Sequence, residues 1–182
     1  MRPLIVVMSF VIAVFAARAS AAPPDERQVG DLGQVGHVDF PISCDPALQA
    51  EFDRGLALLH SFFYPEARRV FNEIVAKDPE CAIAHWGVAM TYYHPLWAAP
   101  DSSELAAGKA SVDRALKAGK QNDHEKSYIR AMQAYYEGLP EPLAEAAPTM
   151  SCHAGGVIDY KGRATCFRRE IEKVAAQYPD DV

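Results

Sequence analysis

Two histidines are the first residues whose spacing could support chemistry. His60 and His94 lie 34 residues apart, each at the end of an apolar, aromatic segment. Imidazole nitrogens are good ligands for zinc and copper ions, so the pair could form a metal or redox site. Alternatively, each ring bonds to carbonyl groups at the C-terminus of its own helix, where the helix dipole favours positive charge. The sequence leaves both interpretations open.

Other patterns that carry chemistry are absent from the sequence. Cys152 and His153 are adjacent, which is not a zinc or haem spacing. There is no nucleophile elbow, zinc-protease motif, Walker loop or dinucleotide-binding glycine fingerprint. Acidic pairs, such as Asp180 with Asp181 and Glu125 with Glu137, are interpreted as solvated surface charge. We therefore predict no enzymatic activity and no cofactor.

Residues 1–21 have the pattern of a secretory signal peptide. Arg2 gives a positive start, Leu4 to Ala17 is an apolar run, and Ala19-Ser20-Ala21 is a small-x-small cleavage site. The apolar run is short for a membrane span, although an uncleaved anchor is the alternative. We expect the mature protein to be secreted or periplasmic, without stable membrane insertion.

The charge of the mature chain limits its partners. Without residues 1–21 it carries 16 basic and 24 acidic residues, a net charge of −8. Basic residues do not cluster beyond pairs, so we expect neither nucleic acid nor an anionic membrane surface as a partner. With 49% hydrophobic residues, the chain can form one domain with a core.

Apolar residues at helical spacing predict an all-α fold. Residues 22–43, rich in glycine, proline and charge, are predicted to be an extended leader that packs Val38 and Phe40 on the first helices. Caps are predicted at Asp45, at Asp101 or Ser102, and at Asp123. The predicted helices run from about 46 to 63, 65 to 77, 81 to 93, 102 to 115, 124 to 136 and 162 to 178. Residues 137–160 are predicted to be an irregular connection.

Small and large residues recur at fixed positions of a 34-residue frame. In a frame that starts at Leu48, Gly55, Ala67, Phe71 and Pro79 fall at positions 8, 20, 24 and 32. Gly55 and Ala67 allow two antiparallel helices to approach, Phe71 fills the gap, and Pro79 ends the second helix. A second frame keeps a small residue at Ala89, and Gly108, Val112 and Ala115 follow about seven residues late.

This pattern matches the tetratricopeptide repeat (TPR), and HSFFYPEA, DPECAIAHWGVAM and HPLW together resemble exported bacterial proteins of that family. The resemblance covers about Val35 to Tyr136. It implies antiparallel helix pairs stacked as a short right-handed solenoid over residues 44–182, acting as a binding scaffold. Residues 178–180 resemble the close of a repeat, so we expect the chain to be part of a longer repeat protein.

In such repeats the first helix of each pair lines the ligand-binding groove. The matching positions here are Gln49, Phe52, Leu56, Leu59, His60, Ile83, Trp86, Met90, Tyr93 and His94. The resulting surface is apolar and aromatic, and could hold an amphipathic helix or an aromatic-rich segment. The alternative is that the leader or a further repeat covers the groove.

The four cysteines of an exported chain are expected to form disulfides, and three pairings are possible. The stacking implied by the TPR resemblance favours one of them. Cys44 and Cys81 each precede the first helix of a repeat, and these helices would run side by side in the same direction. We therefore predict Cys44–Cys81, which leaves Cys152 to pair with Cys166.

These observations together predict an exported helical scaffold that binds a protein or peptide partner. Phe52 and Trp86 are the best candidate anchors for that partner, because buried aromatic residues dominate binding energy. The alternative prediction is a periplasmic metal- or redox-handling protein that uses His60 and His94.

Overall fold

The computed structural model describes residues 35–94, 98–137 and 160–181, and this part of the chain is all-helical. A 3-10 turn, η1 (Pro46–Leu48), leads into the helices α1 (Gln49–His60), α2 (Tyr64–Lys77), α3 (Ala82–Thr91), α4 (Ser102–Lys117), α5 (Asp123–Glu137) and α7 (Tyr160–Gln177). None of these helices is long and apolar enough to cross a bilayer. The predicted signal peptide and the Cys152-His153 pair lie outside the described residues.

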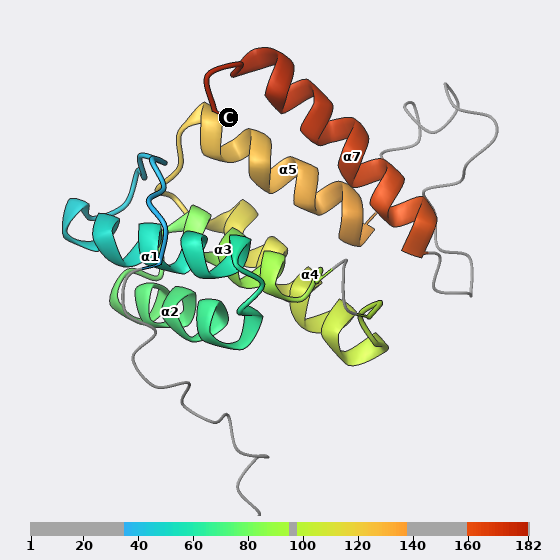
Figure 1. The fold of residues 1–182 in the computed structure, drawn as a ribbon, viewed down its shortest axis with the longest axis horizontal. Helices are drawn as coiled ribbons and strands as arrows, with labels where there is room; N and C mark the ends of the chain where they lie inside the picture. The colour runs from blue at the N-terminus through green and yellow to red at the C-terminus, as the bar shows by residue number, and fades with distance from the viewer. Residues whose placement is uncertain (1–34, 95–97, 138–159, 182) are drawn as a thin grey trace, which may run out of the picture.

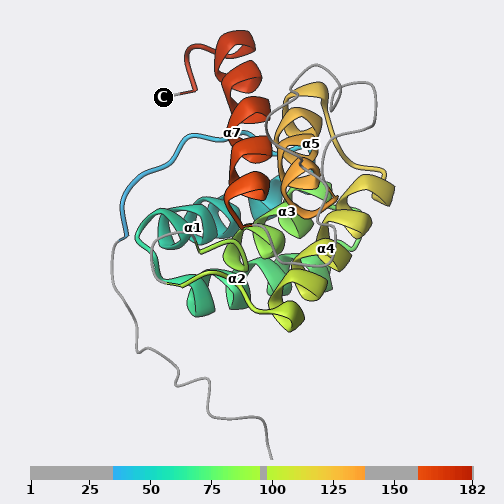
Figure 2. The same ribbon diagram turned by 90° about the vertical axis from the view of Figure 1, so that its right-hand side faces the viewer.

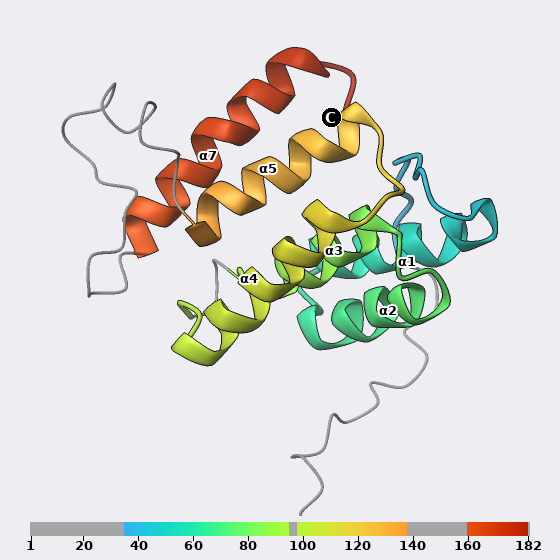
Figure 3. The same ribbon diagram turned by 180° about the vertical axis from the view of Figure 1, so that it is seen from behind.

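Each helix packs against the next along the chain, and α3 is at the centre. It contacts α2 and α4 as its neighbours in sequence, and also α1 and α5. Every residue of α3 except Met90 is buried. The ribbon views show α5 and α7 lying side by side, with α7 on the outside of the bundle (Figure 1, Figure 3). Chain segments far apart in sequence therefore meet on α3 and α5.

Helix α4 begins where the sequence predicted. The Asp101 carboxylate accepts hydrogen bonds from the backbone N–H groups of Ser103 (2.8 Å) and Glu104 (2.9 Å). The Glu104 carboxylate in turn accepts from the backbone N–H of Asp101 (3.0 Å). This reciprocal capping box satisfies N–H groups that have no partner inside the helix.

The ring of Phe71 in α2 lies between two glycines. A Cβ atom on Gly55 of α1 would lie 2.9 Å from this ring, and one on Gly87 of α3 would lie 2.6 Å from it. Phe71 is fully buried, and its ring centroid is 5.6 Å from that of Phe52. The missing side chains let α1 and α3 pack closely against α2. The predicted contact of Gly55 with Phe71 is confirmed, and Gly87 provides a second one.

Replacing Gly87 with alanine should overpack this contact. We expect Gly87→Ala to lower the free energy of unfolding by about 1–3 kcal/mol, measured by urea denaturation. The cost should shrink in a Phe71→Leu background, because the smaller side chain leaves room for the methyl group.

Gly36→Ala is the matched control, since a Cβ atom there meets nothing within 4 Å. It should change the unfolding free energy by less than about 0.5 kcal/mol. Equal effects of the two alanine substitutions would contradict the packing argument.

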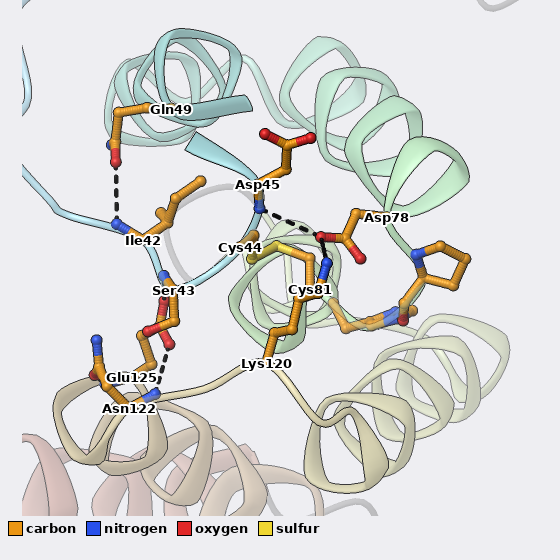
Figure 4. Close-up of a disulfide and its surroundings, with 12 residues drawn as sticks. Ile42, Ser43, Cys44, Asp45, Gln49, Asp78, Cys81, Lys120, Asn122 and Glu125 are labelled. Carbon is orange, nitrogen blue, oxygen red and sulfur yellow. Dashed lines mark hydrogen bonds and ion pairs between the residues drawn. A yellow bond between two sulfur atoms is a disulfide. The ribbon is translucent and has the colours of Figure 1, made fainter. Parts of the chain in front are cut away.

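A disulfide joins the start of α1 to the start of α3, and it is the pairing that the sequence analysis predicted. Cys44 and Cys81 are bonded, with their Cα atoms 5.1 Å apart (Figure 4). Beside them the Asp78 carboxylate accepts hydrogen bonds from Lys120 Nζ (2.7 Å) and from the backbone N–H of Asp45 (3.4 Å). Lys120 lies in the connection between α4 and α5. Three connections therefore meet here, and we call this region the disulfide junction.

Glu125 extends the disulfide junction to the leader. Its carboxylate accepts hydrogen bonds from the backbone N–H groups of Ser43 (2.7 Å) and Asn122 (2.9 Å), as Figure 4 shows. The cap of α5 is Asn122, whose side chain accepts from the N–H of Glu125 (2.8 Å). The predicted cap at Asp123 is therefore wrong by one residue. The interpretation of Glu125 as solvated charge is also wrong, because the residue is fully buried.

The acid sensitivity of the fold should include a contribution from Asp78. Its hydrogen bonds, foremost that from Lys120, hold the pKa of Asp78 below the ordinary value of 3.8. A carboxylate with a lowered pKa stabilises the fold above the pKa of the unfolded chain, and this stability is lost as the pH falls through the folded pKa.

We expect Asp78→Asn to lower the unfolding free energy by about 1–3 kcal/mol above roughly pH 5. The difference from wild type should narrow as the pH falls below 3.8. Urea denaturation over a pH series measures it. A difference that does not depend on pH would show that the Asp78 charge is not what stabilises the junction.

Candidate binding cavity

Side chains of the leader and of four helices line an open-sided cavity of about 280 Å3. Five residues predicted for the groove line it: Leu56, Leu59, His60, Trp86 and Met90. Its other lining residues are Val38, Asp39, Phe40, Tyr128, Phe167, Ile171 and Asp181. The helices α1, α3, α5 and α7 thus each contribute to an apolar chamber with a few polar groups, as is typical of ligand sites.

The leader forms one wall of the cavity. Phe40 is buried, and its ring stacks on His124 at 4.9 Å, while it lies 5.7 Å from Phe52 and 5.4 Å from Tyr128 between centroids. The side chain of Gln49 holds the leader backbone, because its Nε2 donates to the carbonyl of Phe40 (2.9 Å). The leader thus crosses between α1 and the α5–α7 pair (Figure 2). Its predicted packing through Phe40 is confirmed.

The residues after α7 close the cavity from another side. The carboxylate of Asp181 accepts a hydrogen bond from the hydroxyl of Tyr128 (3.0 Å) and pairs with Nε2 of His124 (2.5 Å). The ring of Tyr178 packs edge-on against His124, with centroids 4.5 Å apart. Burial, together with the Asp181 carboxylate, raises the pKa of Tyr128 to about 12. Tyr128 therefore stays protonated and donates at neutral pH.

A wider, more polar hollow of about 810 Å3 adjoins the cavity. We call it the outer hollow, and it is lined by Gly36, His37, Val38, Asp39, Ala57, His60, Ser61, Asp180 and Asp181. Four of these residues, Val38, Asp39, His60 and Asp181, also line the cavity. The cavity and the outer hollow are therefore contiguous. Among the described residues that line them, there are three aspartates and neither lysine nor arginine.

Phe52, one of the two predicted anchors, is a core residue. It has no exposed surface, because Phe40 covers one side of its ring and Phe71 lies on another. The prediction that Phe52 contacts a partner is therefore wrong. Trp86 is 5% exposed and borders the cavity, with its ring edge-on to Tyr128. The Trp86 Nε1–H is buried without a hydrogen-bond acceptor among the described residues.

Other predicted groove positions are also used for packing. Tyr93 lies between Tyr135 (4.6 Å between centroids) and Phe167 (5.1 Å) instead of lining the cavity. Ile83 is fully buried. Gln49 binds the leader, and its Oε1 accepts from the backbone N–H of Ile42 (3.0 Å). The leader thus covers part of the predicted groove, in line with one of the two alternatives that the sequence left open.

The two histidines have different surroundings. His60 is exposed and borders both the cavity and the outer hollow, whereas His94 borders neither. Nδ1 of His94 is 2.8 Å from the carbonyl of Ala98, and Nε2 is 3.1 Å from the carboxylate of Glu104. One alternative from the sequence was that His94 bonds to carbonyl groups at the end of its own helix. The structure shows different partners for its ring. Within the described ranges, no group of three His, Cys, Asp or Glu residues could hold a metal ion.

The second cysteine pair falls partly outside the described residues. Cys166 in α7 is fully buried and disulfide-bonded. Cys152, its predicted partner, lies outside the described ranges.

Sequence reasoning missed the walls that come from α5, α7 and the C-terminal residues. Tyr128, Phe167 and Ile171 lie in helices that the sequence predicted, but no pattern in the sequence placed them beside α1 and α3. Asp181 had been interpreted as solvated charge. The spacing of Asn122 and Glu125 is a capping-box pattern, and it was the one signal that could have placed Glu125 against the backbone.

No family model, curated protein or solved structure matches this chain. The function of the cavity must therefore be inferred from its own side chains.

The two C-terminal aspartates provide a matched pair of variants. We expect Asp181→Asn to lower the unfolding free energy by about 1 kcal/mol, because it weakens the bonds to Tyr128 and His124. Asp180→Asn should have almost no effect, since Asp180 makes no hydrogen bond or ion pair with a described residue. Hydrogen exchange of the backbone amides of Asp180 and Asp181 should rise in the first variant alone. Equal exchange in both variants would show that Asp181 does not hold this segment in place.

Proposed function

We propose that this chain is an exported, TPR-type helical scaffold that binds a segment of a protein partner. The observation that carries this proposal is the cavity itself. Leu56, Leu59, Trp86 and Met90, which the family resemblance assigns to a ligand-binding groove, line a single apolar chamber. These side chains therefore present apolar surface to a space that is open to a ligand.

The order of helix contacts supports a repeat arrangement. The helices α1, α3 and α5 contact one another in turn, and α2 packs between α1 and α3. This is the pattern expected if α1 with α2, α3 with α4, and α5 with α7 are successive helix pairs. The role of a scaffold also agrees with the absence of a catalytic motif from the sequence. Export rests on the signal-peptide pattern of residues 1–21 and on the disulfide.

The size of the cavity indicates what part of a partner would enter it. An apolar cavity of roughly 150 Å3 is enough to hold benzene. A chamber of about 280 Å3 can therefore accept one large apolar or aromatic side chain. The partner would be bound through such an anchor, as in other interfaces whose energy is concentrated in a few buried side chains.

A metal- or redox-handling role, the alternative from the sequence, gains no support from the site. Its two histidines are not brought to one hollow, and both ring nitrogens of His94 already have oxygen partners. Copper or zinc bound in a one-to-one ratio by the mature chain, and lost in His60→Ala, would revive that alternative.

Filling the cavity should weaken partner binding. Peptides selected from a random phage-displayed library on the mature chain serve as the probe, and fluorescence anisotropy measures their affinity. We expect Met90→Trp to weaken binding at least about tenfold, because its indole would occupy the space for the anchor. Selected peptides should be enriched in aromatic and large aliphatic residues.

Leu116→Trp is the control, because Leu116 is an exposed residue of α4 and does not border the cavity. It introduces the same side chain and should leave the affinity unchanged. If Met90→Trp folds like wild type and binds the selected peptides equally well, the cavity is not the binding site.

A further inference from the structure

We infer that the partner segment is basic: a peptide in which a large apolar or aromatic anchor is flanked by lysine or arginine. This inference rests on the proposed function and specifies the chemistry of its partner. The basic character of the partner is inferred because the apolar cavity and the acidic outer hollow adjoin and share residues at their boundary.

Apart from histidine, the charged residues among the described lining of the cavity and the outer hollow are all acidic. Asp39 and Asp181 border both the cavity and the outer hollow, and Asp180 borders the outer hollow. The carboxylate of Asp181 is already bound by Tyr128 and His124. Asp39 and Asp180 are exposed and form no ion pair with a described residue. Two carboxylates are thus available to an arriving ligand, in a protein with a net charge of −6.

The arrangement places these charges next to the apolar chamber. Because Asp39 belongs to both linings, its carboxylate lies at the boundary between cavity and outer hollow. In an extended peptide the side chain two residues from the anchor lies on the same face, about 7 Å further along the chain. A lysine or arginine at that position would therefore reach the outer hollow while the anchor fills the cavity. An acidic neighbour would meet uncompensated like charge there.

The test compares two blocked peptides that share a tryptophan–leucine anchor and differ in their flanking residues, lysine in one and glutamate in the other. At about 0.05 M salt we expect the lysine peptide to bind the mature chain about fivefold more tightly, as two exposed ion pairs would allow. The preference should fall below about twofold at roughly 1 M salt, where screening is strong. Fluorescence anisotropy measures both affinities.

Two double variants connect this preference to the outer hollow. Asp39→Asn with Asp180→Asn should remove it. Glu51→Gln with Glu73→Gln removes the same number of charges from α1 and α2, outside both linings. These glutamates pair with Lys77 and Arg69 at the surface, and their loss should leave the preference intact. Met90→Trp should weaken the lysine peptide at least about tenfold.

The outcomes separate the two proposals. Equal binding of both peptides, lost in Met90→Trp, would overturn the inference about charge and leave the proposed function standing. A lysine preference that both double variants reduce equally would reflect general attraction to an acidic protein, and would also overturn the inference. If neither peptide binds, or if Met90→Trp binds like wild type, the proposed function fails and the inference fails with it.

Discussion

The covalent bond between Cys44 and Cys81 fixes the leader beside the central helix, and the shape of the cavity depends on that placement. The bond spans 37 residues, and closing a loop of this length contributes about 3–4 kcal/mol in the chain-entropy model. The carboxylates of Asp78 and Glu125 then hold the neighbouring backbone and the α4–α5 connection. A buried carboxylate is stable only if its oxygens are hydrogen-bonded, so these two acids also fix the geometry of the chain around them.

The leader changes the nature of the groove behind it. Without Phe40, the faces of α1 and α5 would present Phe52 and Tyr128 to solvent as part of an open apolar surface. With Phe40 in place, most of that surface is buried and one bounded chamber remains. Because a small chamber accepts fewer shapes than an open groove, the leader would make the proposed binding surface more selective.

The sequence predicted the local parts of the fold well. Caps and apolar spacing located the helices, and the small residues at Gly55 and Ala67 together with Phe71 identified the close approach of α1 and α2. The pairing of Cys44 with Cys81 also followed from the repeat interpretation. These features depend on residues within one helix or in helices that lie close together along the chain, so the spacing of residues in the sequence records them directly.

The sequence did not predict which side chains would face a partner. Phe52, Tyr93 and Ile83 have the composition of a binding surface, but the same apolar character also suits them to a core. Which role they take depends on the leader and on α7, and no periodic signal connects either of these to the groove. The burial of Glu125 also depends on the leader, whose Ser43 N–H it binds, so its charge alone could not predict that burial.

The wall provided by the leader has a consequence for the order in which the fold can be completed. Ser43 is bound by a carboxylate 82 residues further along the chain, whereas the disulfide closes a much shorter loop. Contacts between distant positions form slowly, since the intervening chain must first be brought together. Because the disulfide fixes the leader beside α3, the chamber is completed only when the later helices α5 and α7 pack against the wall that Phe40 forms.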